Sequence, residues 1–309
     1  MKSSLLNAKG VNVIAVTPFD ENGQIDAFSV DTMIEFYLDK GVTGLTILGM
    51  MGEAPKLTLK EAIKFTELAV RRAGDIPVIV GASSSGLAAM KELVQAAMGT
   101  GAAGIMIAPT PNLRTDDQIV GYYQLVADEL GSDVPLIVQD FPLVTGVSIS
   151  NSALGIIIET VDSVVMLKHE DWPGLSKITA LRMAEAKGRR RIAILTGNGG
   201  MFLPEELLRG ADGAMTGFSY PEMMVQVCKL INDGKLDEAQ DCFDAYLSFA
   251  RYEQQPGLGL AARKYVLAKR GAIRFDTMRR PGMKLSSTDI IDIDRLLVRQ
   301  ERRLGELGL

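Results

Sequence analysis

The stretch Arg209-Gly210-Ala211-Asp212-Gly213-Ala214-Met215 shows how this chain is built. A glycine ends a predicted helix, because glycine adopts the left-handed conformation without strain, and an apolar strand begins within three residues. The same change from helix to strand occurs at 40–44 and 99–104. Short apolar runs of this kind predict strands at 11–16, 44–48, 77–80, 104–108, 135–138, 164–167, 192–195 and 213–215.

Helical periodicity fills the segments between these runs, for example at 30–38 and 58–71. The predicted strands are apolar on both faces, which is typical of parallel strands covered by helices. Units of strand and helix recur about every 29 residues, and this regularity favours a closed (β/α)8 TIM barrel over an open sheet. We expect a catalytic barrel over residues 1–223.

Beyond Tyr220 the pattern is helical without strands. Apolar stripes predict a C-terminal all-helical extension over residues 224–309, packed on the barrel. The helices of this region are predicted at 221–233, 236–251, 257–270 and 286–304.

Charge restricts the class of partner. The 309 residues include 33 basic and 38 acidic side chains, which gives a net charge of −5 at pH 7. Nucleic acids and anionic membranes attract cationic surfaces, so neither is expected as a partner. We expect a small molecule instead.

Rare residue types exclude further classes of site. A single histidine, His169, excludes a multi-histidine metal site, and two cysteines, Cys228 and Cys242, are too few for a disulfide framework or a zinc cluster. The N-terminal sequence MKSSLLNAKG lacks the apolar run of a signal peptide, and no stretch approaches the roughly 20 apolar residues of a membrane span. We expect a cytoplasmic protein.

The sixth predicted strand ends in Lys168-His169-Glu170, where a barrel enzyme has its active site. Burial disfavours the charged form of an amine, so Lys168 is a candidate to attack a carbonyl and form a Schiff base. Alternation predicts Val164, Met166, Lys168 and Glu170 on one face at the barrel mouth, with His169 toward the helices. The alternative is a lysine that merely extends past the barrel rim.

Two other strand ends carry candidate residues. Gly49-Met50-Met51-Gly52 follows the second strand, and its two glycines allow backbone N–H groups to converge on a carboxylate. Gln139 ends the fifth strand on the face of Ile137 and is a neutral hydrogen-bonding group at the mouth.

These residues resemble the family of dihydrodipicolinate synthase and N-acetylneuraminate lyase, barrel enzymes that form an imine between a lysine and a 2-oxo acid. The resemblance covers nearly the whole chain. It implies that Lys168 forms the imine, that the loop of Gly49, Met50, Met51 and Gly52 holds the substrate carboxylate, and that the protein is a homo-oligomer, a tetramer or a dimer. The motifs in family order are Thr17-Pro18-Phe19, Gly49-x-x-Gly52-Glu53, Asp140-x-Pro142 with Thr145-Gly146, and Lys168.

The chain departs from the synthase and sialate-lyase pattern at several positions. Hydroxyl residues of the loop are replaced by Met50 and Met51, and the proton-shuttling tyrosine is replaced by Gln139. The synthase arginine and the paired tyrosines are replaced by Val144, Thr110 and Pro111. Dihydrodipicolinate synthesis is therefore not the first prediction.

A better motif match is the L-2-keto-3-deoxyarabonate dehydratase branch, which looks like this chain in three motifs: Val138-Gln139-Asp140-x-Pro142, Lys168-x-Glu170 with Gly174, and Gly213-Ala214-Met215-Thr216-Gly217. The polar loop of that branch differs from Gly49-Met50-Met51-Gly52, so the substrate stays open.

We predict a Schiff-base-forming lyase of a small 2-oxo acid, with dehydration of a 2-keto-3-deoxy sugar acid as the first reading. Lys168, Glu170 and Gln139 are the predicted catalytic residues, Glu170 as the acid. No metal or organic cofactor is required, because the imine is the electron sink. Aldol cleavage or condensation, a dihydrodipicolinate synthase-like activity, and a non-catalytic 2-oxo acid binding barrel are the alternatives. Further predicted substrate contacts are Thr17, Asp140, Thr216 and Gly217.

Overall fold

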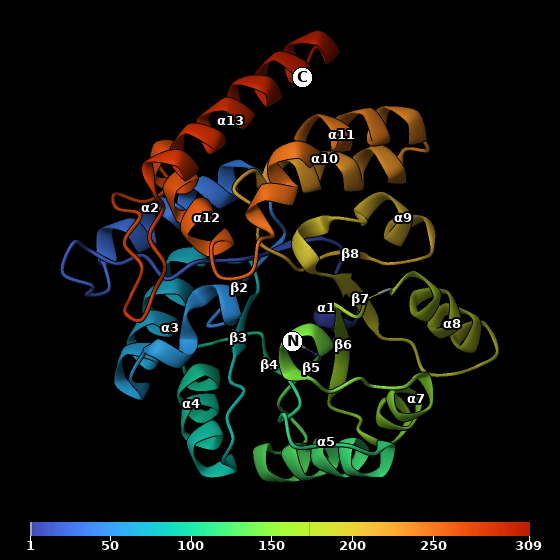
Figure 1. Cartoon of the computed structure of the whole chain (residues 1–309). Helices are drawn as coiled ribbons and strands as arrows, with labels where there is room; N and C mark the ends of the chain where they lie inside the picture. The colour runs from blue at the N-terminus through green and yellow to red at the C-terminus, as the bar shows by residue number, and fades with distance from the viewer. Residues whose placement is uncertain (1, 173) are drawn as a thin grey trace.

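The computed structural model describes residues 2–172 and 174–309, and within them eight parallel strands close into a barrel (Figure 1). Each strand pairs with the next, and β8 pairs with β1 to complete the ring. The predicted barrel is therefore confirmed. The strands are β1 (Gly10–Ile14), β2 (Gly44–Ile47), β3 (Val78–Gly81), β4 (Gly104–Ile107), β5 (Leu136–Asp140), β6 (Val164–His169), β7 (Ala193–Thr196) and β8 (Gly213–Ala214).

Helices surround the barrel in sequence order (Figure 1). Their capping agrees with the sequence, since Thr58 and Thr115 each begin a helix with a capping box. The helices are α2 (Ala27–Asp39), α3 (Leu59–Ala73), α4 (Leu87–Gly99), α5 (Asp116–Leu130), α7 (Asn151–Thr160), α8 (Leu175–Ala186), α9 (Leu203–Leu208) and α10 (Pro221–Asn232). Short turns follow several strands: η1 (Met50–Gly52), η2 (Ala54–Lys56), α6 (Pro142–Thr145) and η3 (Asn198–Gly200).

The remaining helices, α11 (Leu236–Glu253), α12 (Gly259–Lys269) and α13 (Ser287–Leu307), form the predicted C-terminal helical region. In Figure 1 they lie together with α10 on one side of the barrel. Helix α10 packs on both β1 and α11. The predicted boundary between residues 223 and 224 lies inside α10, so barrel and extension are continuous there.

Apolar side chains fill the barrel interior. Ile14, Ile79, Met106, Ile137 and Leu195 are almost wholly buried and belong to one cluster. The short helix α1 (Lys2–Leu6) contacts β6 and adds Leu5 to this cluster, which closes the interior at that point. Within the described residues no helix has both the length and the apolar character needed to cross a membrane.

A β-bulge interrupts β6 before the predicted site. Leu136 pairs with Val164, but the next residue, Ile137, pairs with Met166, so Val165 is an extra residue in the strand. Val165 and Met166 both join the interior cluster, whereas Val164 joins the outer core. The prediction that Val164 shares the face of Lys168 is therefore wrong, because strict alternation holds only after the bulge.

Glu206 is a buried carboxylate on α9, outside the barrel strands. Glu206 is 7% exposed, and its Oε2 has no hydrogen-bond partner among the described residues. Burial raises the pKa of Glu206 to about 7 and outweighs the opposing effects of a Thr196 hydrogen bond and His169, while nearby Glu205 and Glu170 raise it further. Ionised Glu206 therefore destabilises the fold.

We expect Glu206→Gln to stabilise the protein at pH 8 and to have little effect at pH 4. Both states carry the proton below the unfolded pKa of about 4.5, whereas between about 4.5 and 7 only the folded state retains it, so wild-type stability falls as pH rises through this window. The cost is about 1.4 kcal/mol per unit of pKa shift. Urea unfolding of both proteins at the two pH values measures this cost. An equal difference in the free energy of unfolding between variant and wild type at pH 4 and pH 8 would contradict the buried-charge explanation.

Close backbone contact between β1 and β8 depends on Gly213. A Cβ at this position would lie 1.9 Å from the carbonyl oxygen of Gly10, a backbone atom that cannot rotate away. We expect Gly213→Ala to lower the free energy of unfolding by about 1–3 kcal/mol, the usual cost of overpacking. Gly99→Ala is the control, because a Cβ there meets nothing within 4 Å. Equal urea midpoints for the two variants would show that the barrel adjusts freely.

Candidate active site

Lys168 ends β6 inside the barrel mouth. It is 4% exposed, and its Nζ lies 3.1 Å from Oε2 of Glu170, which is 6% exposed. The lysine therefore does not extend past the rim into solvent. A buried amine beside a carboxylate can pass a proton to it and become nucleophilic.

Gln139 completes this group from the neighbouring strand. It pairs in register with Lys168, and its Nε2 donates to the same Glu170 Oε2 at 2.7 Å. The backbone holds Glu170 in place, because its N–H donates to the Asp140 carbonyl and Asn198 Nδ2 donates to its own carbonyl. The three predicted catalytic side chains thus lie together at the ends of β5 and β6.

The backbone just after β7 leaves room for Glu170. A Cβ on Gly197 would lie 2.2 Å from Glu170 Cγ, so a side chain there would displace the carboxylate. Gly197 also donates its N–H to the His169 carbonyl at 2.9 Å. Close approach between β6 and β7 therefore fixes the position of the candidate acid.

A cavity of about 70 Å³ lies over Lys168. Seven predicted site residues line it, while Arg263, Gln254 and Asn198 were not predicted. The lining residues are Ile14, Met50, Met51, Gln139, Phe141, Lys168, Glu170, Asn198, Gly199, Thr216, Gly217, Gln254 and Arg263. Arg263 and Gln254 come from the C-terminal helical region, so this region contributes directly to the candidate site.

Asp140 was predicted to contact substrate, but it does not line the cavity. Alternation turns its carboxylate away from the cavity toward α8, where Oδ2 accepts from Lys177 Nζ at 2.7 Å. His169 shares this outer face as predicted, with Nε2 3.0 Å from the Gly174 carbonyl oxygen. Lys177 also pairs with Asp171 at 2.7 Å. Asp140 therefore supports the strand end from behind and lies outside the cavity lining.

The predicted carboxylate-binding loop forms the turn η1. Gly52 donates its N–H to the Gly49 carbonyl at 2.9 Å, so this N–H already has an acceptor within the loop. Thr17 donates its hydroxyl to the Gly52 carbonyl at 2.6 Å, and it too lies outside the cavity lining. Only Met50 and Met51 of the four loop residues line the cavity over Lys168. Thr17 and Gly52 shape the loop, and the two methionines line the cavity over Lys168.

A buried cation fastens the end of this loop to the C-terminal region. Glu53 has a left-handed backbone, with φ 53°, and is 2% exposed. Its Oε1 accepts from Lys264 Nζ at 2.6 Å and its Oε2 accepts from Lys56 Nζ at 2.7 Å. Burial lowers the pKa of Lys264 to about 8, although Glu53 opposes the shift. The loop is thereby held rigid at the mouth.

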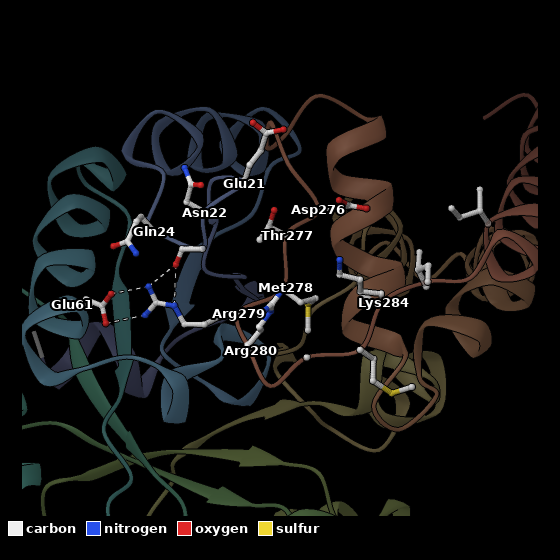
Figure 2. Close-up of a pocket in the computed structure, with 16 residues that line it drawn as sticks. Glu21, Asn22, Gln24, Glu61, Asp276, Thr277, Met278, Arg279, Arg280 and Lys284 are labelled. Atoms are coloured by element: carbon white, nitrogen blue, oxygen red, sulfur yellow. Dashed lines mark hydrogen bonds and ion pairs between the residues drawn. The ribbon is translucent and has the colours of Figure 1, made fainter.

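A larger hollow, of about 910 Å³, is lined mainly by the loop at 21–24 and by residues between 276 and 285 (Figure 2). One of the cations that line it, Arg279, donates to both oxygens of Glu61 and to the Gly23 carbonyl (Figure 2). This pairing holds the pKa of Glu61 down at about 2. Arg279 also donates its backbone N–H to Glu53 at 3.1 Å. The hollow has a polar lining that is distinct from the lining of the cavity over Lys168, so it is not the candidate active site.

Comparison with known proteins shows the family of this chain. The model of the dihydrodipicolinate synthetase family matches residues 7–298. A crystal structure of dihydrodipicolinate synthase from Rhodopseudomonas palustris is similar, with 47% identity and a TM-score of 0.94 over 95% of this chain and 98% of that chain.

Two curated relatives carry the name 4-hydroxy-tetrahydrodipicolinate synthase. The protein of Thiobacillus denitrificans is 27% identical over 99% of this chain and 99% of its own length. The protein of Clostridium tetani is 33% identical over 75% of this chain and 77% of its own length. The family match spans most of the sequence, and the chain belongs to the dihydrodipicolinate synthetase family.

Proposed function

We propose that the protein is a class I lyase in which Lys168 forms an imine with a small 2-oxo acid. One observation carries the proposal: the Lys168 amine is buried at the end of β6, 3.1 Å from Glu170, and lines a cavity. Family membership supports the reaction class.

Imine formation follows from the pair of Lys168 and Glu170. A proton passes from the ammonium to the carboxylate, which produces a neutral amine and a neutral acid. The amine forms a bond to the C2 carbon of the 2-oxo acid, and one amine proton moves to the C2 oxygen. Glu170 then protonates this oxygen, which leaves as water, and a protonated imine and the Glu170 carboxylate remain.

The imine has two exits. In cleavage, a base takes the proton of a C4 hydroxyl and the C3–C4 bond breaks. An aldehyde leaves, and the electrons of the broken bond convert the protonated imine to an enamine. Condensation is the reverse reaction. In dehydration, Glu170 removes a C3 proton to form the enamine, and the C4 hydroxyl then takes up that proton and leaves as water. Both exits use the same lysine.

The names of the relatives favour the first exit, carbon–carbon bond formation, over our dehydratase prediction. Dehydration of a 2-keto-3-deoxy sugar acid is the second candidate, favoured by Gln139, an amide that cannot shuttle a proton as a phenol does. The L-2-keto-3-deoxyarabonate dehydratase branch rests on sequence motifs alone. A panel of 2-keto-3-deoxy acids, assayed separately for pyruvate release and for water loss, distinguishes the two.

The assembly and its partners are further proposals. We retain a homo-oligomer, a dimer or tetramer, although one similar structure is that of a monomeric dihydrodipicolinate synthase variant. A 2-oxo acid and an aldehyde are the proposed small-molecule partners.

We expect Lys168→Arg to abolish exchange of the C3 protons of pyruvate with solvent deuterium, because a guanidinium stays charged and cannot form an imine. Proton NMR of pyruvate in deuterium oxide measures the exchange. Lys91→Arg is the matched control, since Lys91 pairs with Glu129 near the surface. Exchange in Lys168→Arg at the wild-type rate would remove Lys168 from the mechanism. A wild-type protein that binds pyruvate without any exchange would indicate the non-catalytic alternative.

We expect Glu170→Gln to slow both imine formation and product formation by about a hundredfold or more, the usual scale of general acid or base catalysis, because an amide neither takes the Lys168 proton nor protonates the leaving oxygen. Borohydride trapping follows the imine, and product assays follow both exits. The amide occupies the same space beside Gln139, so packing changes little. Unchanged product rates would assign the proton transfer to another group.

A further inference from the structure

Arg263 is a buried cation that the proposed mechanism leaves unused. It lies on α12 and is 2% exposed. Its Nε donates to Glu253, and its Nη2 donates to the Gly217 carbonyl at 2.5 Å. Its Nη1 has no acceptor among the described residues. A buried charged donor without an acceptor is costly, so its retention calls for a ligand or a structural reason.

Glu253 holds the guanidinium in its orientation. This carboxylate is 1% exposed and also accepts from the hydroxyl and the backbone N–H of Ser219. Two fixed contacts, to Glu253 and Gly217, therefore leave Nη1 as the free end of Arg263. Arg263 and Lys168 line the same cavity.

The free nitrogen lies on the side of the cavity next to the predicted carboxylate-binding loop. A Cβ on Gly217 would lie 2.1 Å from Arg263 Nη1 and 3.0 Å from the Ile14 carbonyl oxygen, which places Nη1 beside the end of β1. A Cβ on Gly52 would lie 3.5 Å from the Ala15 carbonyl oxygen, so the loop passes the end of the same strand. Gln139 lies on β5, across the barrel from β1.

We propose that Arg263 binds the carboxylate of the 2-oxo acid through Nη1 while Lys168 attacks its C2 carbon. This inference rests on the proposed function and names the group that recognises its substrate. The side chains of Met50 and Met51 offer no hydrogen-bond donor, so this loop can reach a carboxylate only through its backbone N–H groups, and Arg263 adds a charged donor to them. A guanidinium suits a carboxylate because its donors are planar and its charge is permanent.

The competing explanation is a brace between helices. Arg263 on α12 pairs with Glu253 on α11, and such a pair holds the helices together whether or not substrate binds. A brace affects all ligands of the cavity alike. A carboxylate-binding residue instead affects ligands that carry a carboxylate and spares those that lack one.

The test compares pyruvate with pyruvamide, its neutral amide, as ligands of the purified full-length chain. Concentration series with borohydride trapping give an apparent affinity for each compound, and their ratio measures selectivity for the carboxylate. The main variant is Arg263→Gln with Glu253→Gln, because the double change removes the ion pair without leaving a lone buried carboxylate. Arg263→Lys is the second variant and retains the positive charge.

We expect the double variant to lose about 10- to 100-fold of the preference for pyruvate, the scale of one hydrogen bond to a charged group. Arg263→Lys should lose at least about threefold, because an ammonium does not reproduce the fork of a guanidinium. The matched control is Arg182→Gln, which removes a guanidinium paired with Asp212, outside the cavity lining, and should keep the wild-type ratio.

A wild-type ratio in any folded Arg263 variant, judged by circular dichroism, would overturn the proposal and leave the brace. Should the double variant not fold, Arg263→Lys decides alone. Failure of the wild-type protein to trap either compound contradicts the proposed function instead. Calorimetric affinities for pyruvate and pyruvamide then supply the same ratio without an imine, so Arg263 is tested in either case.

Discussion

The ion pair between Lys168 and Glu170 places two charges where water barely reaches them. Removing charges from water costs several kcal/mol each, and the loss is recovered only when further hydrogen bonds complete the pair. Here Gln139 donates to the carboxylate, and the backbone of Asp140 and the side chain of Asn198 hold the main chain of Glu170. Strand β5 and the turn η3 after β7 supply these contacts, so the closed sheet brings together the groups that stabilise the pair.

Three further buried ion pairs lie around the cavity. Asp140 with Lys177 supports the end of β5, Glu53 with Lys264 supports the loop after β2, and Glu253 with Arg263 supports the wall next to β8. The first two pairs join a strand end or its loop to a helix, and the third joins α11 to α12. The C-terminal helices contribute Lys264, Glu253 and Arg263, so the extension helps to form the mouth of the barrel as well as covering its side.

Local signals predicted much of this architecture. Apolar runs bounded by glycine predicted the strands, and the 3.6-residue stripes predicted the C-terminal helices, because both periodicities act over a few residues. The same alternation correctly brought Gln139, Lys168 and Glu170 together. It failed for Val164, because an extra residue at Val165 changes the phase of the strand, and no residue type at that position announces a bulge.

Contacts between residues far apart in the sequence could not be predicted. Asp140 was expected at substrate, but its partner Lys177 lies 37 residues further along the chain. Arg263 reaches the carbonyl of Gly217, 46 residues earlier, and no local pattern encodes that approach. One signal was available: Arg263 and Lys264 are adjacent cations between Ala261, Ala262 and the apolar pair of Val266 and Leu267 in one helix, and charges set among apolar neighbours indicate buried partners.

The most direct test of the account is to locate the covalent adduct in the wild-type protein. Borohydride reduction in the presence of carbon-13-labelled pyruvate, followed by proteolysis and tandem mass spectrometry, identifies the modified lysine. The account predicts a single labelled site at Lys168, although Lys177 and Lys264 are also buried. Label on either of those lysines, or no label at a pyruvate concentration that saturates binding, would contradict it.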